Sequence, residues 1–219
     1  LDDTAEVVRG RVDYCRRLLS LLDPATGPDR VRLLDPETVA SMELEPAPLS
    51  SHNGTTPRLF GRGAASSAIC DLAALFKAED LTLDHPHSPT GMVRIDDHAC
   101  TGCGACATAC PTGALDFAQR EGEVSLTFDP VSCTACAKCV KVCPEAESGA
   151  IRMDQVTDVA ALGRGLTTVF EDSEKMCEVC GKSIAPSAML RRIEVLLGDE
   201  EPKLTSQLTR FCVECRGTQ

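Results

Sequence analysis

Eight of the fourteen cysteines in this chain form two runs with the same spacing, C-x2-C-x2-C-x3-C-P. Thiolates at this spacing hold cubane iron–sulfur clusters, whose chemistry is electron transfer. Four sulfurs must converge on one compact group, and small residues between them, such as Gly102, Gly104 and Ala135, let backbone amides approach the sulfurs. The runs are Cys100, Cys103, Cys106, Cys110-Pro111 and Cys133, Cys136, Cys139, Cys143-Pro144.

Disulfides and separate zinc sites are the alternatives for these eight cysteines. The chain shows no secretory signal, and a disulfide framework gives no reason for two runs of identical spacing. A three-iron cluster would lack the second cysteine of a run, and both runs are complete. The pattern therefore favours two [4Fe-4S] clusters.

The two runs belong to an internal repeat. A shift of 33 positions maps residues 100–111 onto 133–144, and Ile95-Asp96 onto Phe128-Asp129. Short strands are expected at 92–95, 123–128 and 151–153. On these residues the segment from about Val93 to Met153 resembles a bacterial-type dicluster ferredoxin domain. The resemblance implies a pseudo-symmetric unit in which the fourth cysteine of each run ligates the other cluster. The implied sets are Cys100, Cys103, Cys106 and Cys143 for the first cluster, and Cys133, Cys136, Cys139 and Cys110 for the second.

Two further C-x2-C pairs lie near the end of the chain, Cys177/Cys180 and Cys212/Cys215. Paired knuckles of this kind assemble tetrahedral four-thiolate sites, and zinc is their commonest occupant. A rubredoxin-like single iron would use the same ligands, although the segment is poor in aromatic residues, and a third cubane would break the spacing of the first eight cysteines. The sequence predicts structural zinc, with a helix over 187–198 whose face of Met189, Ile193, Leu196 and Leu197 packs beside the metal.

The remaining segments suggest an α+β chain of three domains. Residues 1–91 are predicted as a helical and irregular docking segment, 92–156 as the dicluster ferredoxin domain and 157–219 as a small zinc-binding domain. A helix is expected over 6–22, with one apolar face made of Val8, Val12, Cys15, Leu19 and Leu22, and a second helix over 66–77. A strand is expected at 31–34, and loops at 45–63 and 84–91. Cys15, Cys70 and the four histidines fit core or surface roles. His98, two residues from Cys100, fits a role around the cluster or on the surface.

The net charge, the length of the apolar runs and the cysteine content limit which partners and which compartment suit this chain. The net charge of −11 argues against nucleic acid and suits a basic docking face on a redox partner. No apolar run has the length of a membrane span, so membrane association would come through a partner. The cysteine content points to a reducing compartment, the cytoplasm. The chain begins with Leu1, which suggests that an upstream portion precedes it.

The flanks of the cluster segment favour a fixed position in a complex. Val8 to Leu34 resembles the tail of the iron–sulfur delta subunit of methyl-viologen-type hydrogenases, although the cysteine motifs of that tail are absent here. The resemblance implies a relay of single electrons between a catalytic subunit, such as a hydrogenase or formate dehydrogenase, and another carrier. The alternative is a free ferredoxin with accessory domains. No nucleophile–base pair, dinucleotide loop or open metal site is evident, so the chain is not expected to be catalytic by itself.

Overall fold

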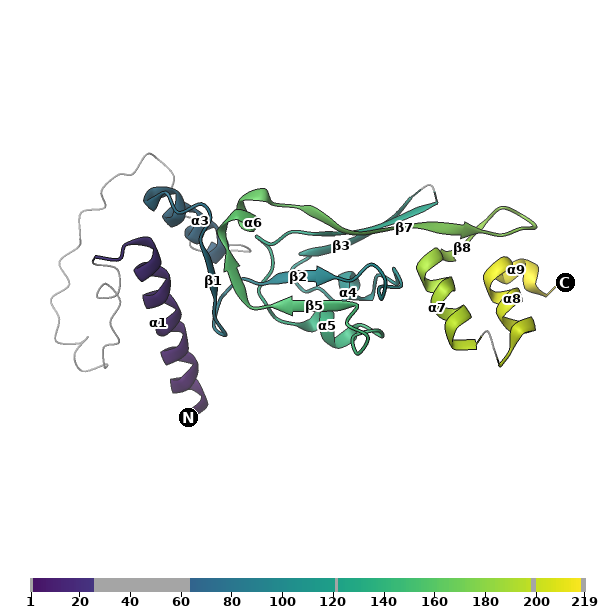
Figure 1. Cartoon of the computed structure of the whole chain (residues 1–219), viewed down its shortest axis with the longest axis horizontal. Coiled ribbons are helices and arrows are strands. Elements are labelled where there is room, and N and C mark those ends of the chain that lie inside the picture. The colour runs from purple at the N-terminus through teal and green to yellow at the C-terminus, as the bar shows by residue number, and fades with distance from the viewer. Residues whose placement is uncertain (1, 26–63, 121, 198–199, 218–219) are drawn as a thin grey trace. The chain divides into compact units, whose positions relative to one another are not determined.

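The structure is a computed structural model that describes residues 2–25, 64–120, 122–197 and 200–217. By their contacts the residues form two compact units (Figure 1), one built from the chain up to Thr90 with Gln155–Gly163, the other from Gly91–Asp154 with the chain from Arg164 onward. The mixture of helices and strands confirms the α+β class. Residues 155–163 thus pack with the amino-terminal segment, and the cysteine-rich tail packs with the cluster segment. The strand predicted at 31–34 and the loop at 45–63 lie outside the described residues.

The first unit pairs two helices with a small sheet. Helix α1 (Asp2–Leu22) and helix α3 (Ala64–Phe76) contact each other, strand β1 (Thr82–Asp84) pairs antiparallel with β6 (Val156–Asp158), and α6 (Val159–Arg164) follows. Both predicted helices are confirmed. Leu22 is buried as predicted, but the rest of the buried face of α1 differs from the predicted one, since Tyr14 and Leu18 are buried while Val8 is exposed. Burial of the large Tyr14 ring orients the helix, so that the side containing Tyr14, Leu18 and Leu22 is buried.

A buried hydroxyl network closes this unit. Thr157 on β6 is fully buried, and its Oγ1 lies 2.6 Å from the Tyr14 hydroxyl, 2.9 Å from Ser88 Oγ and 3.1 Å from Thr90 Oγ1. Thr90 donates onward to the Val156 carbonyl at 2.9 Å. Every hydroxyl therefore has a partner, as burial of polar groups requires. The segment expected to be a linker at 84–91 is part of this core.

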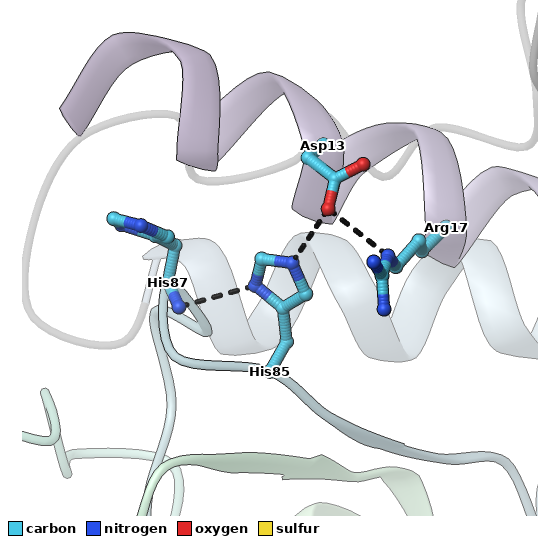
Figure 2. Close-up of polar contacts among 4 residues, drawn as sticks. All are labelled: Asp13, Arg17, His85 and His87. Atoms are coloured by element: carbon cyan, nitrogen blue, oxygen red, sulfur yellow. Dashed lines mark hydrogen bonds and ion pairs between the residues drawn. The ribbon is translucent and has the colours of Figure 1, made fainter. Parts of the chain in front are cut away.

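His85 joins the same segment to helix α1 (Figure 2). The His87 backbone N–H donates to His85 Nδ1 at 3.1 Å, so the ring proton lies on Nε2, which donates to Asp13 Oδ2 at 3.1 Å. This hydrogen bond from His85 holds the pKa of Asp13 below its usual range. Gly10 leaves room for a neighbour, because a Cβ there would meet His87 Nε2 at 2.1 Å. The buried His85 is thus a structural histidine.

The second unit contains two sheets. Strand β2 (Met92–Ile95) pairs antiparallel with β5 (Ile151–Asp154). A four-stranded antiparallel sheet has the order β3 (Leu115–Arg120), β4 (Glu123–Phe128), β7 (Thr167–Met176) and β8 (Ser183–Pro186). The strands predicted at 92–95, 123–128 and 151–153 are confirmed, whereas β3, β7 and β8 were not predicted.

Five helices complete the second unit. Two are single turns within the cysteine runs, α4 (Ala105–Thr108) and α5 (Lys138–Val142), and they pack against each other. Helix α7 (Ser187–Leu197) confirms the predicted helix, and α8 (Pro202–Arg210) and α9 (Val213–Arg216) follow. The expected apolar face of α7 is wrong, because Leu196 is 57% exposed and the buried residues are Ala188 and Leu190. Helix α7 contacts β7, β8 and α8.

Local features of one cysteine run recur in the other, 33 positions along. Gly102 and Gly104 have φ of +66° and +70°, and Ala135 and Ala137 have φ of +53° and +55°. The carboxylate of Asp96 accepts backbone N–H groups at the start of the first run, and Asp129 does so at the second. Cysteines of both runs, among them Cys100 and Cys133, pack against one hydrophobic core. Its buried residues are Val93, Ala114, Leu115, Val124, Leu126, Phe128, Cys139, Ile151, Phe170 and Ala188.

Candidate metal centres

Two cavities lie in the cysteine-rich part of the second unit, and each is lined by four cysteines. The first is lined by three cysteines of the first run and the last cysteine of the second: Cys100, Cys103, Cys106 and Cys143. Its apolar walls include Phe117, Leu126, Ile151 and Phe170. Strand β7 supplies Phe170, so this cavity draws on a residue well beyond the repeat.

The second cavity has the complementary composition. It is lined by three cysteines of the second run and the last cysteine of the first: Cys133, Cys136, Cys139 and Cys110. Its walls are Val93, Ala114, Leu115, Phe128, Met153 and other uncharged residues, all from the segment 93–153. One cysteine of each cavity, Cys103 or Cys136, is exposed to solvent.

The two short helices place the cavities close together. Helix α4 carries Cys106 of the first cavity and is followed by Cys110 of the second, while α5 carries Cys139 of the second and is followed by Cys143 of the first. Four residues of helix advance the chain by about 6 Å. Sulfurs of different cavities are therefore near neighbours along one compact helix pair.

Backbone amides point at the sulfurs in a repeated pattern. The N–H of Gly102 bonds Cys100 and the N–H of Ala135 bonds Cys133, at equivalent positions of the two runs. Burial raises the pKa of both thiols, and these amide bonds act in the opposite direction. Such N–H···S bonds favour the charged sulfur and tune a bound metal group.

Burial is the dominant influence on the inner cysteines. It raises the pKa of Cys106 to about 12, against the bond from the Ala107 N–H. At Cys110 burial also acts to raise the pKa, but the N–H of Leu115 and the neighbouring donors outweigh it, so that pKa is lowered. Anionic sulfurs gathered in an apolar cavity require compensating positive charge. The donor set and its surroundings thus fit an iron–sulfur group.

The four tail cysteines form a much tighter cluster. Cys177 follows β7, Cys180 lies in the knuckle before β8, Cys212 precedes α9, and Cys215 lies within α9. All four sulfurs lie within 4.8 Å of one another, and those of Cys180 and Cys212 are 3.6 Å apart. Within the described part of the chain no other group of three or more metal-ligating side chains gathers so closely.

The sulfur spacing matches a single metal ion. Metal–sulfur bonds of about 2.3 Å in a tetrahedron separate the sulfurs by about 3.8 Å, close to the observed 3.6 Å. A four-iron cube is wider than one ion and would hold its ligands farther apart. The backbone N–H of Cys212 is the largest of the influences that lower the pKa of Cys177 to about 6, which favours the thiolate that a metal needs.

Interactions between the two knuckles hold the four sulfurs together. Arg210 beside the second knuckle pairs with Glu178 in the first, with its Nε 2.9 Å from Glu178 Oε1. Lys182 beside the first knuckle pairs with Glu214 in the second, so the charges of this pair are reversed. The turn after Cys180 is closed by Gly181, whose N–H donates to the Cys177 carbonyl at 2.9 Å.

Of the other residues singled out from the sequence, His98 lines a surface groove with Cys100 and Glu145, and Cys15 and Cys70 belong to the first unit. His98 is exposed, and its backbone N–H donates to Asp96. Cys15 and Cys70 are half-buried on α1 and α3.

Glu145 and Arg192 were missed by the sequence analysis, although they lie beside the first cavity. Arg192 Nε lies 2.9 Å from Glu145 Oε1, and this hydrogen bond lowers the pKa of the Glu145 carboxyl. The residues are 47 positions apart in the chain, and no sequence pattern connects them.

Comparison with known proteins supports the cluster assignment. Residues 99–147 match the model of the 4Fe-4S dicluster domain family. No curated protein matches the chain. None of the helices in the described part is both long and apolar enough to cross a membrane. The chain thus contains a ferredoxin-like iron–sulfur domain, which points to an electron-transfer protein, and its tail holds a four-cysteine site fit for a metal ion.

Proposed function

We propose that this chain is an electron-relay subunit of a larger oxidoreductase, in which two [4Fe-4S] clusters pass single electrons between a catalytic subunit and another carrier. The observation that carries the proposal is the pair of four-cysteine cavities on one helix pair and one core. An enzyme of the hydrogenase or formate dehydrogenase kind is the proposed donor or acceptor, and the cytoplasm is the proposed compartment. The chain itself holds the redox groups and does no bond-making chemistry.

The proposed ligand sets are crossed. Cys100, Cys103, Cys106 and Cys143 hold the first cluster, because these four line the first cavity. The second cluster is held by Cys133, Cys136, Cys139 and Cys110, which line the second. The recurring left-handed turns and N–H···S bonds support a pseudo-symmetric pair of sites. Each half of the repeat then completes the site of the other, so the two sites fold together.

In electron transfer the protein would hold the clusters, shield them from water and set their reduction potentials. When bound, each cluster gains or loses one electron at a potential set by its surroundings. Phe117, Leu126 and Phe170 exclude water from the first site, and backbone amides stabilise charge on the sulfurs. The exposed Cys103 and Cys136 mark the edges where the sites approach a partner. No part of this scheme requires the protein to move.

For the tail we propose structural zinc at Cys177, Cys180, Cys212 and Cys215. The single-ion spacing of the sulfurs supports one tetrahedral metal, and the apolar wrapping that a rubredoxin-like iron would have is sparse here, since Val179 and Val213 beside the knuckles are exposed. The metal would join strand β7 to helix α9 and so stabilise a segment with a small core.

Cysteine variants test the crossed assignment. Cys110→Ser is expected to alter the same electron paramagnetic resonance signal as Cys136→Ser, and Cys143→Ser the same signal as Cys103→Ser. If Cys110→Ser instead altered the signal that Cys103→Ser alters, the ligands would not be crossed.

Purification from native cells tests the relay. Co-elution with a flavin-, molybdenum- or nickel-containing subunit supports the proposed role. A stable lone chain that exchanges electrons with soluble partners contradicts it and identifies a free ferredoxin-type carrier.

A further inference from the structure

The two cluster cavities differ in charge. The cavity of Cys110 and Cys133 is lined by uncharged residues alone, whereas the cavity of Cys100 includes Glu145. Glu145 is the second residue after Cys143, and the equivalent second residue after Cys110 is Thr112. The two halves of the repeat therefore differ, because only the first cavity has a carboxylate, that of Glu145, in its lining.

Helix α7 of the tail brings the opposite charge to that carboxylate. Arg192 Nε lies 2.9 Å from Glu145 Oε1, where the glutamate side chain is only 14% exposed and the arginine 37% exposed. Glu145, Arg192 and Cys100 also line a common surface groove. Partial burial weakens the screening of both charges by water, so each acts on the neighbouring site more strongly than a surface charge.

The ion pair also fixes the loop that follows Cys143. The backbone N–H of Glu145 bonds the sulfur of Cys143, and Ser148 Oγ donates to the other oxygen of Glu145 at 3.3 Å. Helix α7 is itself anchored to β7, where the Ser187 hydroxyl donates to the Ser173 carbonyl at 2.7 Å. Arg192 is therefore held in place by the attachment of α7 to β7 and by its own ion pair with Glu145.

We propose that Arg192 is a positioning residue that raises the reduction potential of the cluster at Cys100, Cys103, Cys106 and Cys143, and that helix α7 thereby sets this cluster apart from its twin. The inference rests on the proposed function. Reduction adds a negative charge, so Glu145 opposes it and Arg192 favours it. Without Arg192 the unpaired carboxylate would make this cluster harder to reduce, while the other cluster, whose cavity neither Glu145 nor Arg192 lines, would change less.

Redox titration of the full chain with both clusters, followed by electron paramagnetic resonance, tests this inference. Arg192→Gln is expected to lower the potential of one cluster, with a roughly tenfold smaller equilibrium constant for reduction, which is about 59 mV for one electron. Glu145→Gln is expected to raise the same potential, and the double variant to lie near the wild type. Signals are assigned with Cys103→Ser and Cys136→Ser.

Arg191→Gln is the control for exposure, because Arg191 lines the same groove and carries the same charge but is exposed to water, which screens that charge. It should shift the potential much less than Arg192→Gln does. Arg192→Lys keeps the charge and should stay close to the wild type, which separates the charge from any effect of poor folding. Iron content, measured for every variant, identifies loss of a cluster.

The possible outcomes separate this inference from the function on which it rests. If the wild type gives two reducible signals but Arg192→Gln moves neither, or moves both equally, the inference is wrong and the relay stands. An equal fall in potential for Arg192→Lys and Arg192→Gln would also overturn the role of charge. A wild-type chain with a single reducible cluster overturns the proposed function and this inference together.

Discussion

Gly102 and Ala135 occupy equivalent places in the two cysteine runs, with φ of +66° and +53°, yet they differ in the space around them. A Cβ added to Gly102 would lie 3.0 Å from Phe170 Cε1 and 3.2 Å from Pro186 Cβ. Both neighbours belong to the β7–β8 hairpin, which contributes Phe170 to the lining of the first cavity and no residue to that of the second. Ala135 shows that an alanine is tolerated at the equivalent position of the second run. We nevertheless expect Gly102→Ala to destabilise the second unit, because the added Cβ would contact the hairpin.

The magnitude follows from two contributions. A left-handed backbone costs a residue with a Cβ about 1–2 kcal/mol. Overpacking against the hairpin adds about 1–3 kcal/mol, since Phe170 and Pro186 are buried and must shift. The expected loss is about 3 kcal/mol. Ala135→Gly is the control. It relieves strain in the folded state but raises the conformational entropy of the unfolded chain, so the free energy of unfolding should change by no more than about 1 kcal/mol.

The assay is thermal unfolding of the cluster-loaded chain at a fixed heating rate, followed by loss of visible cluster absorption, because unfolding with cluster loss is irreversible. Gly102→Ala should lose absorption at a clearly lower temperature than the wild type, and Ala135→Gly at nearly the same temperature. Equal effects of the two substitutions would refute the close packing of the hairpin on the first run.

Three further predictions concern the tail and the first unit. Cys212→Ser should abolish stoichiometric zinc and loosen the tail while both cluster signals persist; loss of a reducible signal would instead identify a redox metal there. Thr157→Val should destabilise the first unit by about 3 kcal/mol, because it deprives Tyr14 and two other buried hydroxyls of a partner; unchanged hydrogen exchange in α1 would contradict this. The lowered pKa of Asp13 predicts a contribution to stability that is complete above the ordinary aspartate pKa of about 3.9 and is lost as the pH falls through the lower folded value. Amide protection in α1, corrected for the slower intrinsic exchange at lower pH, should therefore fall on acidification in the wild type, and an equal fall in Asp13→Asn would remove His85 from the explanation.

Local spacing made the cluster segment readable from the sequence. The cysteine runs, the 33-residue repeat and the strands at 92–95 and 123–128 depend on residues close together in the chain, and the structure and the family match agree with them. The tail cysteines were grouped correctly for the same reason, since two C-x2-C pairs have few other uses.

What the sequence did not reveal depends on long-range packing. Strand β7 has a β-branched start at Thr167-Thr168-Val169, which could have suggested a strand, but its charged second half obscured the pattern. The pairing of Arg192 with Glu145 depends on where β7 places helix α7. The buried face of α1 does not follow from its aliphatic residues alone, because the Tyr14 hydroxyl binds Thr157 in the core.

The central claim, two [4Fe-4S] clusters in one chain beside a separate single-metal site, is tested most directly by one measurement on the intact protein. Metal and sulfide analysis should be combined with electron paramagnetic resonance of the fully reduced form. We expect about eight irons and one zinc per chain, and the spectrum of two interacting clusters. About four irons, or the spectrum of one isolated cluster in fully loaded protein, would contradict the account.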